Sequence, residues 1–257
     1  MRKLSNLAMA CLGAVAMLSF SGVTFAEGAV KVNVANGKNI FENGKADAGV
    51  AACATCHGEK ALGNDAMGAP RLSHLGYVYV VKQLTDFSAD KRTGNDVGAV
   101  MNGFAKALSE QERRDVAAYV NTLAKASEPS DLGALKAEGK PVGEAYKGQI
   151  LVRYGRTGDK GVSACSSCHG FNGRGADPVY PKIGQQKYVY LVNQLTHWRD
   201  GSRSNDPKGQ MRAMAKNLSD EDINNVAAFL SQASDSTAGG GMEVSNQTVL
   251  NNINKHQ

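Results

Sequence analysis

The sequence predicts an all-α fold made of two tandem domains that are related by duplication. Three observations predict it. One half of the chain repeats the other, apolar side chains recur at helical spacing in each copy, and the alternating pattern typical of strands is nearly absent. A long period with only two copies indicates a duplicated domain and not a solenoid. Each domain would hold roughly 100 residues.

The repeat extends well beyond a single motif. It includes a cysteine motif, a tyrosine-rich segment, a methionine and part of the last helix. The matched segments are Cys53–His57 with Cys165–His169, Tyr77–Val81 with Tyr188–Val192, Gln83–Thr85 with Gln194–Thr196, Met101 with Met211, and Ala117–Tyr119 with Ala227–Phe229.

Helices can be placed in the same order in each copy. A short helix is expected before each cysteine motif, around Lys38–Glu42 and over Glu144–Tyr154. The central helix of each copy has apolar side chains at positions i, i+3, i+4 and i+7, which form one stripe. These positions are Tyr77, Val80, Val81 and Leu84 in the first copy, and Tyr188, Leu191, Val192 and Leu195 in the second.

The last helix of each copy begins with a capping pattern. Ser109 is followed three residues later by Glu112, and Ser219 by Asp222, so each pair can satisfy backbone N–H groups at a helix start. Between the copies, residues 126–143 are polar and contain proline and glycine, which predicts a linker. Residues 234–257 are rich in serine, glycine and asparagine, which is typical of a disordered tail.

Each copy contains one C-x-x-C-H motif, the spacing of a c-type haem attachment site. The two thiols form thioethers with the haem vinyl groups, and the adjacent imidazole binds the iron. A zinc site of four cysteines would leave both histidines without a role, and a redox C-x-x-C requires a βαβ context that neither flank has. We therefore expect two covalently attached haem c groups, held by Cys53, Cys56 and His57 in the first copy and by Cys165, Cys168 and His169 in the second.

The sixth iron ligand decides what each haem can do, because a thioether fills the coordination position and favours electron transfer. Met101 and Met211 occur at the same place in the two copies, seven residues before the Leu-Ser that precedes the last helix. Met67 and Met214 have no methionine opposite them, so we expect them to be packing residues. The predicted axial pairs are His57 with Met101 and His169 with Met211.

Other residues near the motifs could have supporting roles. His74 and His197 do not correspond to each other, so a shared bis-histidine design is disfavoured and surface or loop positions are expected. The carbonyl groups of Pro70 and Pro181, which do correspond, could accept the second N–H of each ligating imidazole. Arg92 and Arg203 also correspond and could pair with haem propionates, although exposed arginines are commonly just solvated.

The N-terminus predicts export. Arg2 and Lys3 precede an apolar run, and small residues follow it, so residues 1–26 are read as a signal peptide that is cleaved before Glu27. Cys11 lies inside the apolar run, and the exported chain would keep only the four haem cysteines. A lipoprotein processed at Cys11 and an uncleaved anchor are the alternatives. The predicted parts are thus 1–26, a domain over 27–125, a linker over 126–143, a domain over 144–233 and a tail over 234–257.

Charge limits the choice of partners. The formal net charge of the whole chain is +5, which is too weak a basic balance to suggest nucleic acid. Every chemical feature is used in binding two haems, so no small-molecule substrate and no catalytic residue is expected. The partners would be proteins that donate and accept electrons.

The repeated motifs resemble the two-haem cytochrome c4 family, which consists of two class I cytochrome c domains in tandem. The resemblance covers about residues 30–233 and rests on C-x-x-C-H, a downstream proline, a tyrosine-rich helix and a methionine before Leu-Ser. It implies a periplasmic shuttle that carries single electrons from a quinol-oxidising complex to terminal oxidases or reductases. Association with the membrane surface is compatible with this role. The resemblance also implies that the two domains pack face to face through their propionate edges.

Two other functions stay open from the sequence. The chain could be the cytochrome subunit of a periplasmic oxidoreductase such as flavocytochrome sulfide dehydrogenase, which predicts a stable catalytic partner. It could also be a two-haem peroxidase, which would need one iron with an open coordination position. The paired methionines count against the peroxidase, because they would fill that position in both domains.

Overall fold

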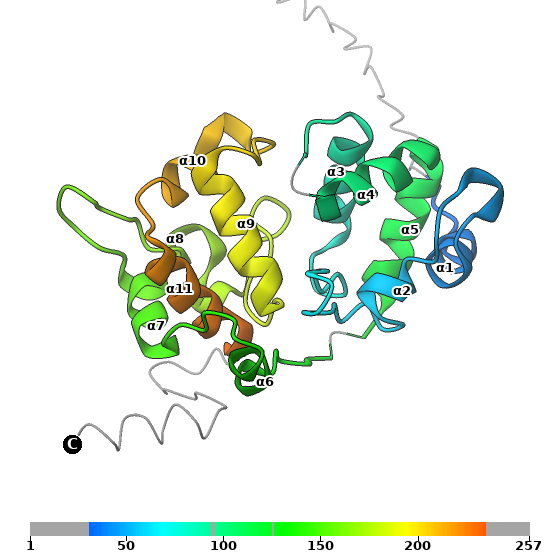
Figure 1. The fold of residues 1–257 in the computed structure, drawn as a ribbon. Coiled ribbons are helices and arrows are strands. Elements are labelled where there is room, and N and C mark those ends of the chain that lie inside the picture. Colours follow the sequence, from blue (N-terminus) through cyan, green and yellow to red (C-terminus); the bar gives the residue numbers. More distant parts are fainter. Residues whose placement is uncertain (1–30, 94–95, 125, 235–257) are drawn as a thin grey trace, which may run out of the picture. The chain divides into compact units, whose positions relative to one another are not determined.

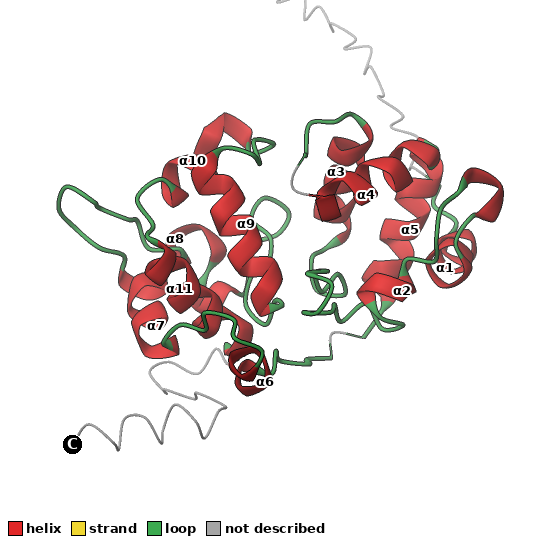
Figure 2. Cartoon of the chain, viewed as in Figure 1, coloured by secondary structure: helices red, strands yellow, loops and turns green. Residues whose placement is uncertain are grey.

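The computed structural model describes residues 31–93, 96–124 and 126–234. The predicted signal peptide and almost all of the predicted tail lie outside these residues. Within them the chain forms helices joined by loops, and strand pairing is limited to isolated bridges (Figure 2). The all-α prediction is therefore confirmed for the described part of the chain.

The first half contains five α-helices and one short 3-10 helix (Figure 1). Both the predicted helix before the cysteine motif and the capping box at the last helix are present. Ser109 Oγ accepts a hydrogen bond from the N–H of Glu112 at 3.2 Å, and Glu112 accepts one from the N–H of Ser109 at 2.7 Å. The elements are α1 (Val34–Asn43), η1 (Ala46–Ala48), α2 (Ala54–His57), α3 (Tyr77–Ser88), α4 (Asp96–Ala107) and α5 (Glu110–Thr122).

The second half repeats this order of α-helices with two differences. A 3-10 helix follows the helix of the cysteine motif, whereas in the first half η1 precedes it. A 3-10 helix and a short α10 stand where the first half has the single, longer α4. The capping box of Ser219 and Asp222 is again formed, with N–H···O distances of 3.0 Å and 2.9 Å. The elements are α7 (Ala145–Tyr154), α8 (Ser166–His169), η2 (Phe171–Gly173), α9 (Tyr188–Asp200), η3 (Pro207–Gly209), α10 (Gln210–Ala215) and α11 (Asp220–Gln232).

The predicted linker contains a helix that the sequence reading did not include. This helix, α6 (Leu132–Ala137), begins after Asp131, whose carboxylate accepts a hydrogen bond from the N–H of Ala134 at 2.9 Å. Leu135 is buried and packs in the core of the second half. A capping aspartate and one buried leucine therefore stabilise a short helix within an otherwise polar segment.

Each half is built around a close crossing of its first and last helices. α1 packs on α5 and α7 packs on α11. A glycine lies at each crossing: a Cβ atom on Gly37 would lie 2.0 Å from the carbonyl oxygen of Asp115, and one on Gly148 would lie 1.9 Å from that of Asn225. No side chain fits at either position, so the glycines allow the two backbones to touch.

Two main cores follow from these crossings, one in each half. In the first half Ile40, Phe41 and Val120 are among the fully buried side chains, and in the second half Val152, Ile223 and Leu230 are. Each such side chain contributes about 1.5–3 kcal/mol when it is removed from water. The cysteine motifs attach directly to these cores, because Cys53 packs on the first and Cys165 on the second.

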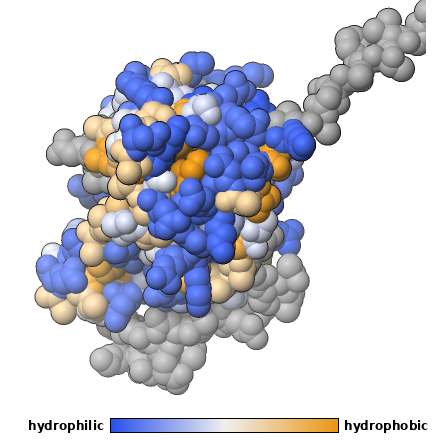
Figure 3. Space-filling model, turned by 90° about the vertical axis from the view of Figure 1, so that its right-hand side faces the viewer, coloured by the Kyte–Doolittle hydropathy of each residue, from blue (hydrophilic) through white to orange (hydrophobic). Residues whose placement is uncertain are grey.

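The surface carries few large apolar side chains. The face seen in Figure 3 is mainly hydrophilic, with hydrophobic residues in separate small areas. No helix in the described ranges is both long and apolar enough to cross a membrane.

Candidate haem-binding sites

The proximal residues of the first site lie on one helical turn. Cys53 is the N-cap of α2, and Cys56 and His57 lie within it. His57 is buried, and its Nδ1 lies 2.9 Å from the carbonyl oxygen of Pro70. Because a carbonyl can only accept, Nδ1 carries the proton and donates it. The other ring nitrogen, Nε2, is then the one free to bind a metal.

The second site has the same arrangement. Cys165 is the N-cap of α8, and the Nδ1 of the buried His169 donates to the carbonyl oxygen of Pro181 at 2.8 Å. Burial lowers the pKa of both His57 and His169, although the hydrogen bond to each proline carbonyl acts in the opposite direction. Both imidazoles are thus neutral at pH 7, which is the form that ligates iron. The predicted role of the two prolines is confirmed by these distances.

The four cysteines are arranged for thioether formation and not for a shared zinc ion. All four are unpaired by disulfides. Burial raises the pKa of Cys53 and of Cys165 to about 11, so both are protonated thiols at pH 7 in the free chain. Among the described residues, no group of three or more metal-binding side chains comes together. The two motifs lie on different helices, α2 and α8, so each offers one haem attachment site.

The segment that carries Pro70 and Arg71, called the strap below, orients His57 and is itself held by the second half. Arg71 follows Pro70 and is fully buried. The side chain of Gln186 accepts a hydrogen bond from the N–H of Arg71 at 2.7 Å and donates one to its carbonyl oxygen at 2.9 Å. This paired contact fixes the backbone next to the Pro70 carbonyl, and so fixes the acceptor that orients His57.

The two candidate methionine ligands lie on corresponding segments. Met101 is in α4 and Met211 is in α10, and both are half-buried. Met211 packs against the core of the second half. Met67 and Met214 are more exposed, at 44% and 36%. The assignment of Met101 and Met211 as axial ligands stays a prediction.

The two remaining histidines differ from each other. His197 lies on α9 and is half-buried, and burial lowers its pKa. His74 lies in a turn, as expected, but its side chain is buried and not on the surface. It lies one residue before Leu75, which belongs to the small core around α3. The sequence pattern could not indicate this, because a histidine in a polar stretch resembles any loop residue.

A buried polar network involves corresponding residues of both halves. Arg92 is only 7% exposed, although the sequence reading allowed a solvated arginine. Its guanidinium donates to Gln83 of the same half at 2.8 Å, and to Tyr190 and Gln194 of the second half at 2.9 Å each. The same group stacks on the ring of Phe87, 4.5 Å from its centroid.

Arg203 makes the reciprocal contacts. It is 4% exposed and donates to Gln194 at 2.6 Å, to Tyr79 at 3.3 Å and to Gln83 at 3.1 Å. Burial lowers the pKa of Arg203, and the neighbouring Arg92 lowers it further. Two guanidinium groups thus lie together in a low-dielectric setting where amide and phenol oxygens accept their hydrogen bonds. The pairing of Arg92 and Arg203 with haem propionates stays a prediction.

The phenol of Tyr190 responds to the same charges. Burial alone would raise its pKa, but the adjacent Arg92 and Arg203 outweigh this and lower it.

The structural roles of Gln83, Gln194 and Gln186 were not predicted from the sequence. A signal was present for the first two, because Gln-Leu-Thr recurs in the apolar central helix of both copies. Buried amides repeated at one place in a helix indicate a shared polar contact.

The sites can now be compared with known proteins. A family model described as cytochrome c matches residues 34–124 and 157–234. A cytochrome c4 of Stutzerimonas stutzeri is 35% identical over 198 residues, which cover 73% of this chain and 88% of that protein. The chain belongs to the cytochrome c4 family. It therefore has two class I cytochrome c folds in tandem, binds two covalently attached haem c groups and transfers electrons.

Other relatives of this cytochrome have names that refer to sulfur chemistry. A protein of Stutzerimonas stutzeri strain A1501 named as a thiosulfate dehydrogenase electron acceptor is 32% identical over 210 residues, which cover 82% of this chain and 92% of that protein. A solved thiosulfate dehydrogenase of Marichromatium purpuratum matches with a TM-score of 0.68 and 31% identity, covering 81% of this chain. This cytochrome spans only 42% of that longer chain.

Proposed function

We propose that this cytochrome is a periplasmic electron shuttle that carries single electrons from a quinol-oxidising complex to terminal oxidases or reductases. In this role the chain is not itself an enzyme. When bound, each haem supplies one iron that changes between ferric and ferrous states. The protein's contribution is to orient a neutral imidazole on one side of each haem and to offer a thioether on the other.

One observation carries this proposal: both halves hold the ligating histidine by the same contact and place a methionine at the same point of the chain. His57 and His169 donate to Pro70 and Pro181 over nearly equal distances, 2.9 Å and 2.8 Å. A carrier needs two saturated irons, whereas a peroxidase needs one open iron. Met101 and Met211 as axial ligands would saturate both.

The first test is the absorption spectrum of the purified protein with haem counted per chain. Two haems, the weak absorption of methionine-bound ferric iron and no carbon monoxide binding are expected. Met101→Ala and Met211→Ala should each open one haem to carbon monoxide. An unchanged spectrum in either variant would remove that methionine from the ligand set. Carbon monoxide binding by the unaltered protein would favour the peroxidase.

A second candidate is the electron acceptor of a periplasmic oxidoreductase, for which thiosulfate dehydrogenase is the specific case. It is favoured by the relative that bears this name and is matched over 92% of its length. The two candidates differ in their electron donor. Stopped-flow reduction of the ferric protein by a thiosulfate dehydrogenase with thiosulfate, and separately by a quinol-oxidising complex with quinol, decides between them. The donor that reduces it at the higher second-order rate is the physiological class.

Export is part of the proposal. Attachment at Cys53–His57 and Cys165–His169 and the leader-like residues 1–26 both favour the periplasm, with contact to the membrane surface. Cell fractionation with mass measurement of the mature N-terminus tests this. A chain that begins at Glu27 in the periplasmic fraction supports cleavage, and a chain that keeps residues 1–26 in the membrane fraction supports an anchor.

A further inference from the structure

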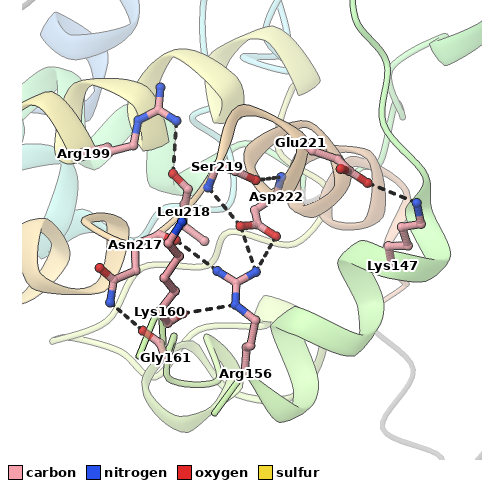
Figure 4. Close-up of polar contacts among 10 residues, drawn as sticks. All are labelled: Lys147, Arg156, Lys160, Gly161, Arg199, Asn217, Leu218, Ser219, Glu221 and Asp222. Carbon is pink, nitrogen blue, oxygen red and sulfur yellow. Dashed lines mark hydrogen bonds and ion pairs between the residues drawn. The ribbon is translucent and has the colours of Figure 1, made fainter. Parts of the chain in front are cut away.

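A cluster of polar contacts in the second half joins the loop after α7 to the start of α11 (Figure 4). Arg156 donates to both carboxylate oxygens of Asp222, at 2.9 Å and 3.0 Å, and to the carbonyl oxygens of Asn217 at 3.0 Å and Lys160 at 3.1 Å. The side-chain amide of Asn217 donates in return to the carbonyl oxygen of Gly161 at 2.9 Å. Arg156 and Asn217 thus tie one loop to one helix junction by several hydrogen bonds.

The cluster lies between two segments that belong to the second haem site. The loop that begins at Arg156 is closed by a bridge between Arg156 and Val162, and it leads directly into Cys165. Asn217 lies just after α10, the helix of Met211, and Asp222 lies in the first turn of α11. The cluster therefore joins the segment before the haem cysteines to the segment that carries the predicted sixth ligand.

The first half has a simpler contact at the matching place. Lys45 corresponds to Arg156 and Glu112 to Asp222, and their side chains form an ion pair with an N···O distance of 2.8 Å. An ammonium group lacks the planar fork with which a guanidinium binds a carboxylate and a carbonyl at once. The residue that matches Asn217 is Ala107, whose methyl side chain has no donor.

We propose that Arg156 is a positioning residue that holds Met211 in place as the ligand of the second haem. The proposal rests on the proposed function, since it takes Met211 as that ligand. Dissociation of a methionine is a local opening of its segment, and its free energy depends on the contacts that tie the segment down. The side chains of Arg156 and Asp222 are 38% and 16% exposed, so water screens their charges in part. Paired hydrogen bonds still fix the geometry of the junction.

A second arginine holds the same junction from another direction. Arg199 of α9 donates to the carbonyl oxygen of Leu218 at 3.1 Å and to Asp220 at 2.7 Å. These contacts support the junction but do not reach the loop before Cys165. Arg156 makes most of the contacts between the loop and the junction, and Asn217 adds one to Gly161, so the loss of Arg156 should act on methionine release more than on the packing of the half.

The test is an imidazole titration of the ferric, full-length exported protein with both haems in place. Imidazole binds only where methionine has left the iron, so its apparent affinity reports the opening of each segment. The two ligated methionine methyl groups give separate proton NMR signals in the reduced protein, and Met101→Ala and Met211→Ala assign them. This assignment also tests the premise: if Met211→Ala removes no signal, the ligand proposal fails before the positioning proposal is reached.

Arg156→Ala should raise imidazole affinity at the Met211 haem on the order of tenfold and leave the Met101 haem unchanged. Arg156→Lys keeps the positive charge but not the planar fork, so it should raise imidazole affinity less. This variant replaces Arg156→Ala in the test if the alanine variant folds poorly. Asn217→Ala should cause a smaller rise at the same haem. Lys45→Ala is the matched control and should act at the Met101 haem alone.

Two results would overturn the proposal. One is an Arg156→Ala protein whose imidazole affinity equals that of the unaltered protein at both haems. The other is an equal rise at both haems together with a lower midpoint of global unfolding by circular dichroism, which would show a general structural role instead of a local one.

Discussion

The two halves hold their histidines by the same contact and their helix crossings by different ones. Both imidazoles donate to a proline carbonyl. At the crossing of the first half, the carboxylate of Asp115 accepts from the N–H of Asn33 at 2.8 Å. At the crossing of the second half, the amide oxygen of Asn225 accepts from the N–H of Glu144 at 2.6 Å. A charged group and a neutral group thus occupy the same structural position.

The segments that carry the methionines also differ. In the first half Met101 lies on a long helix, α4, near a lysine ion pair, and in the second half Met211 lies on a short helix, α10, near an arginine cluster. What is repeated is the set of contacts that any covalently bound haem requires. What differs is the set that adjusts local stability and local charge. One fold can therefore hold two haems of different potential, because the surroundings change while the proximal ligand does not.

The largest effect is expected from substituting the glycine at one helix crossing, which destabilises one half and leaves the other intact. Gly37→Ala should destabilise the first half and Gly148→Ala the second, each by about 3 kcal/mol or more, because the new Cβ would lie about 2 Å from a backbone oxygen. Hydrogen exchange, read separately on α1 with α5 and on α7 with α11, checks which half opens. Gly103→Ala in α4 is the control, since its Cβ would meet no atom within 4 Å and should be nearly neutral or slightly stabilising. Equal exchange in both halves would contradict independent crossings.

The next effect tests how far the second half controls the first haem. Gln186→Leu should cost about 2 kcal/mol, because the buried N–H of Arg71 loses its acceptor. It should also shift the reduction potential of the first haem and leave the second almost unchanged, since the strap that carries Pro70 moves. A spectroscopic redox titration measures both potentials.

The control for this change is Gln185→Asn. Gln185 accepts from the side chain of Arg71 at 3.1 Å but does not touch its backbone, and asparagine tolerates the left-handed conformation found there, with φ of 60°. It should leave the first potential in place. If it shifts that potential as much as Gln186→Leu does, the backbone contact is not the cause.

A smaller effect is expected in how the stability of each half depends on pH. Hydrogen bonds from Asn33, Asn36 and Gln111 lower the pKa of Asp115 in spite of its burial. A carboxyl with a lowered folded pKa contributes stability above its unfolded pKa near 3.8 and loses it as pH falls through the lower folded value. The first half should therefore lose stability first on acidification, while Asn225 does not titrate.

Asp115→Asn is the variant that checks this. It should cost about 1–2 kcal/mol at pH 7, because the charge that accepts three hydrogen bonds is lost. It should also flatten the acid dependence of hydrogen exchange in α1 and α5. An unchanged acid dependence in the variant would place the titration on another group of the first half, such as Glu112, whose pKa is lowered by its hydrogen bond with Lys45.

Much of this comparison could be predicted from the sequence, and the reason lies in how local each feature is. The cysteine motifs, the amphipathic central helices and the capping boxes at Ser109 and Ser219 each depend on residues within four positions of one another. The burial of Arg92 and Arg203 could not be predicted, because their partners are contributed by the other half. Helix α6 was missed because one buried side chain, Leu135, gives no periodic pattern.

The cluster around Arg156 was missed for the same physical reason. Arg156 lies 61 positions from Asn217 and 66 from Asp222, and single polar residues in loops usually contact water. The repeat contained a weak signal, because the pair formed by Lys45 and Glu112 and the pair formed by Arg156 and Asp222 keep opposite charges at matching places. Only the fold brings each pair together.

The smallest expected effect concerns the outer face of the first helix in each half. On α7 three apolar side chains are exposed in a row, at Tyr146, Ile150 and Tyr154, with exposures of 54%, 41% and 77%. The matching positions on α1 are Ala35, Asn39 and Asn43, of which Asn43 donates to Asn39 at 2.9 Å. Placing the α1 residues on α7 should change the free energy of unfolding by less than about 1 kcal/mol, because little apolar surface leaves the core.

Urea unfolding of the triple variant measures this change. A loss well above that value would show that another part of the chain covers these side chains, and a value near zero would show that the two helices differ only in what they present to solvent. In the second case the apolar row of α7 contributes little to folding, and the difference between the halves extends from their interiors to their exposed surfaces.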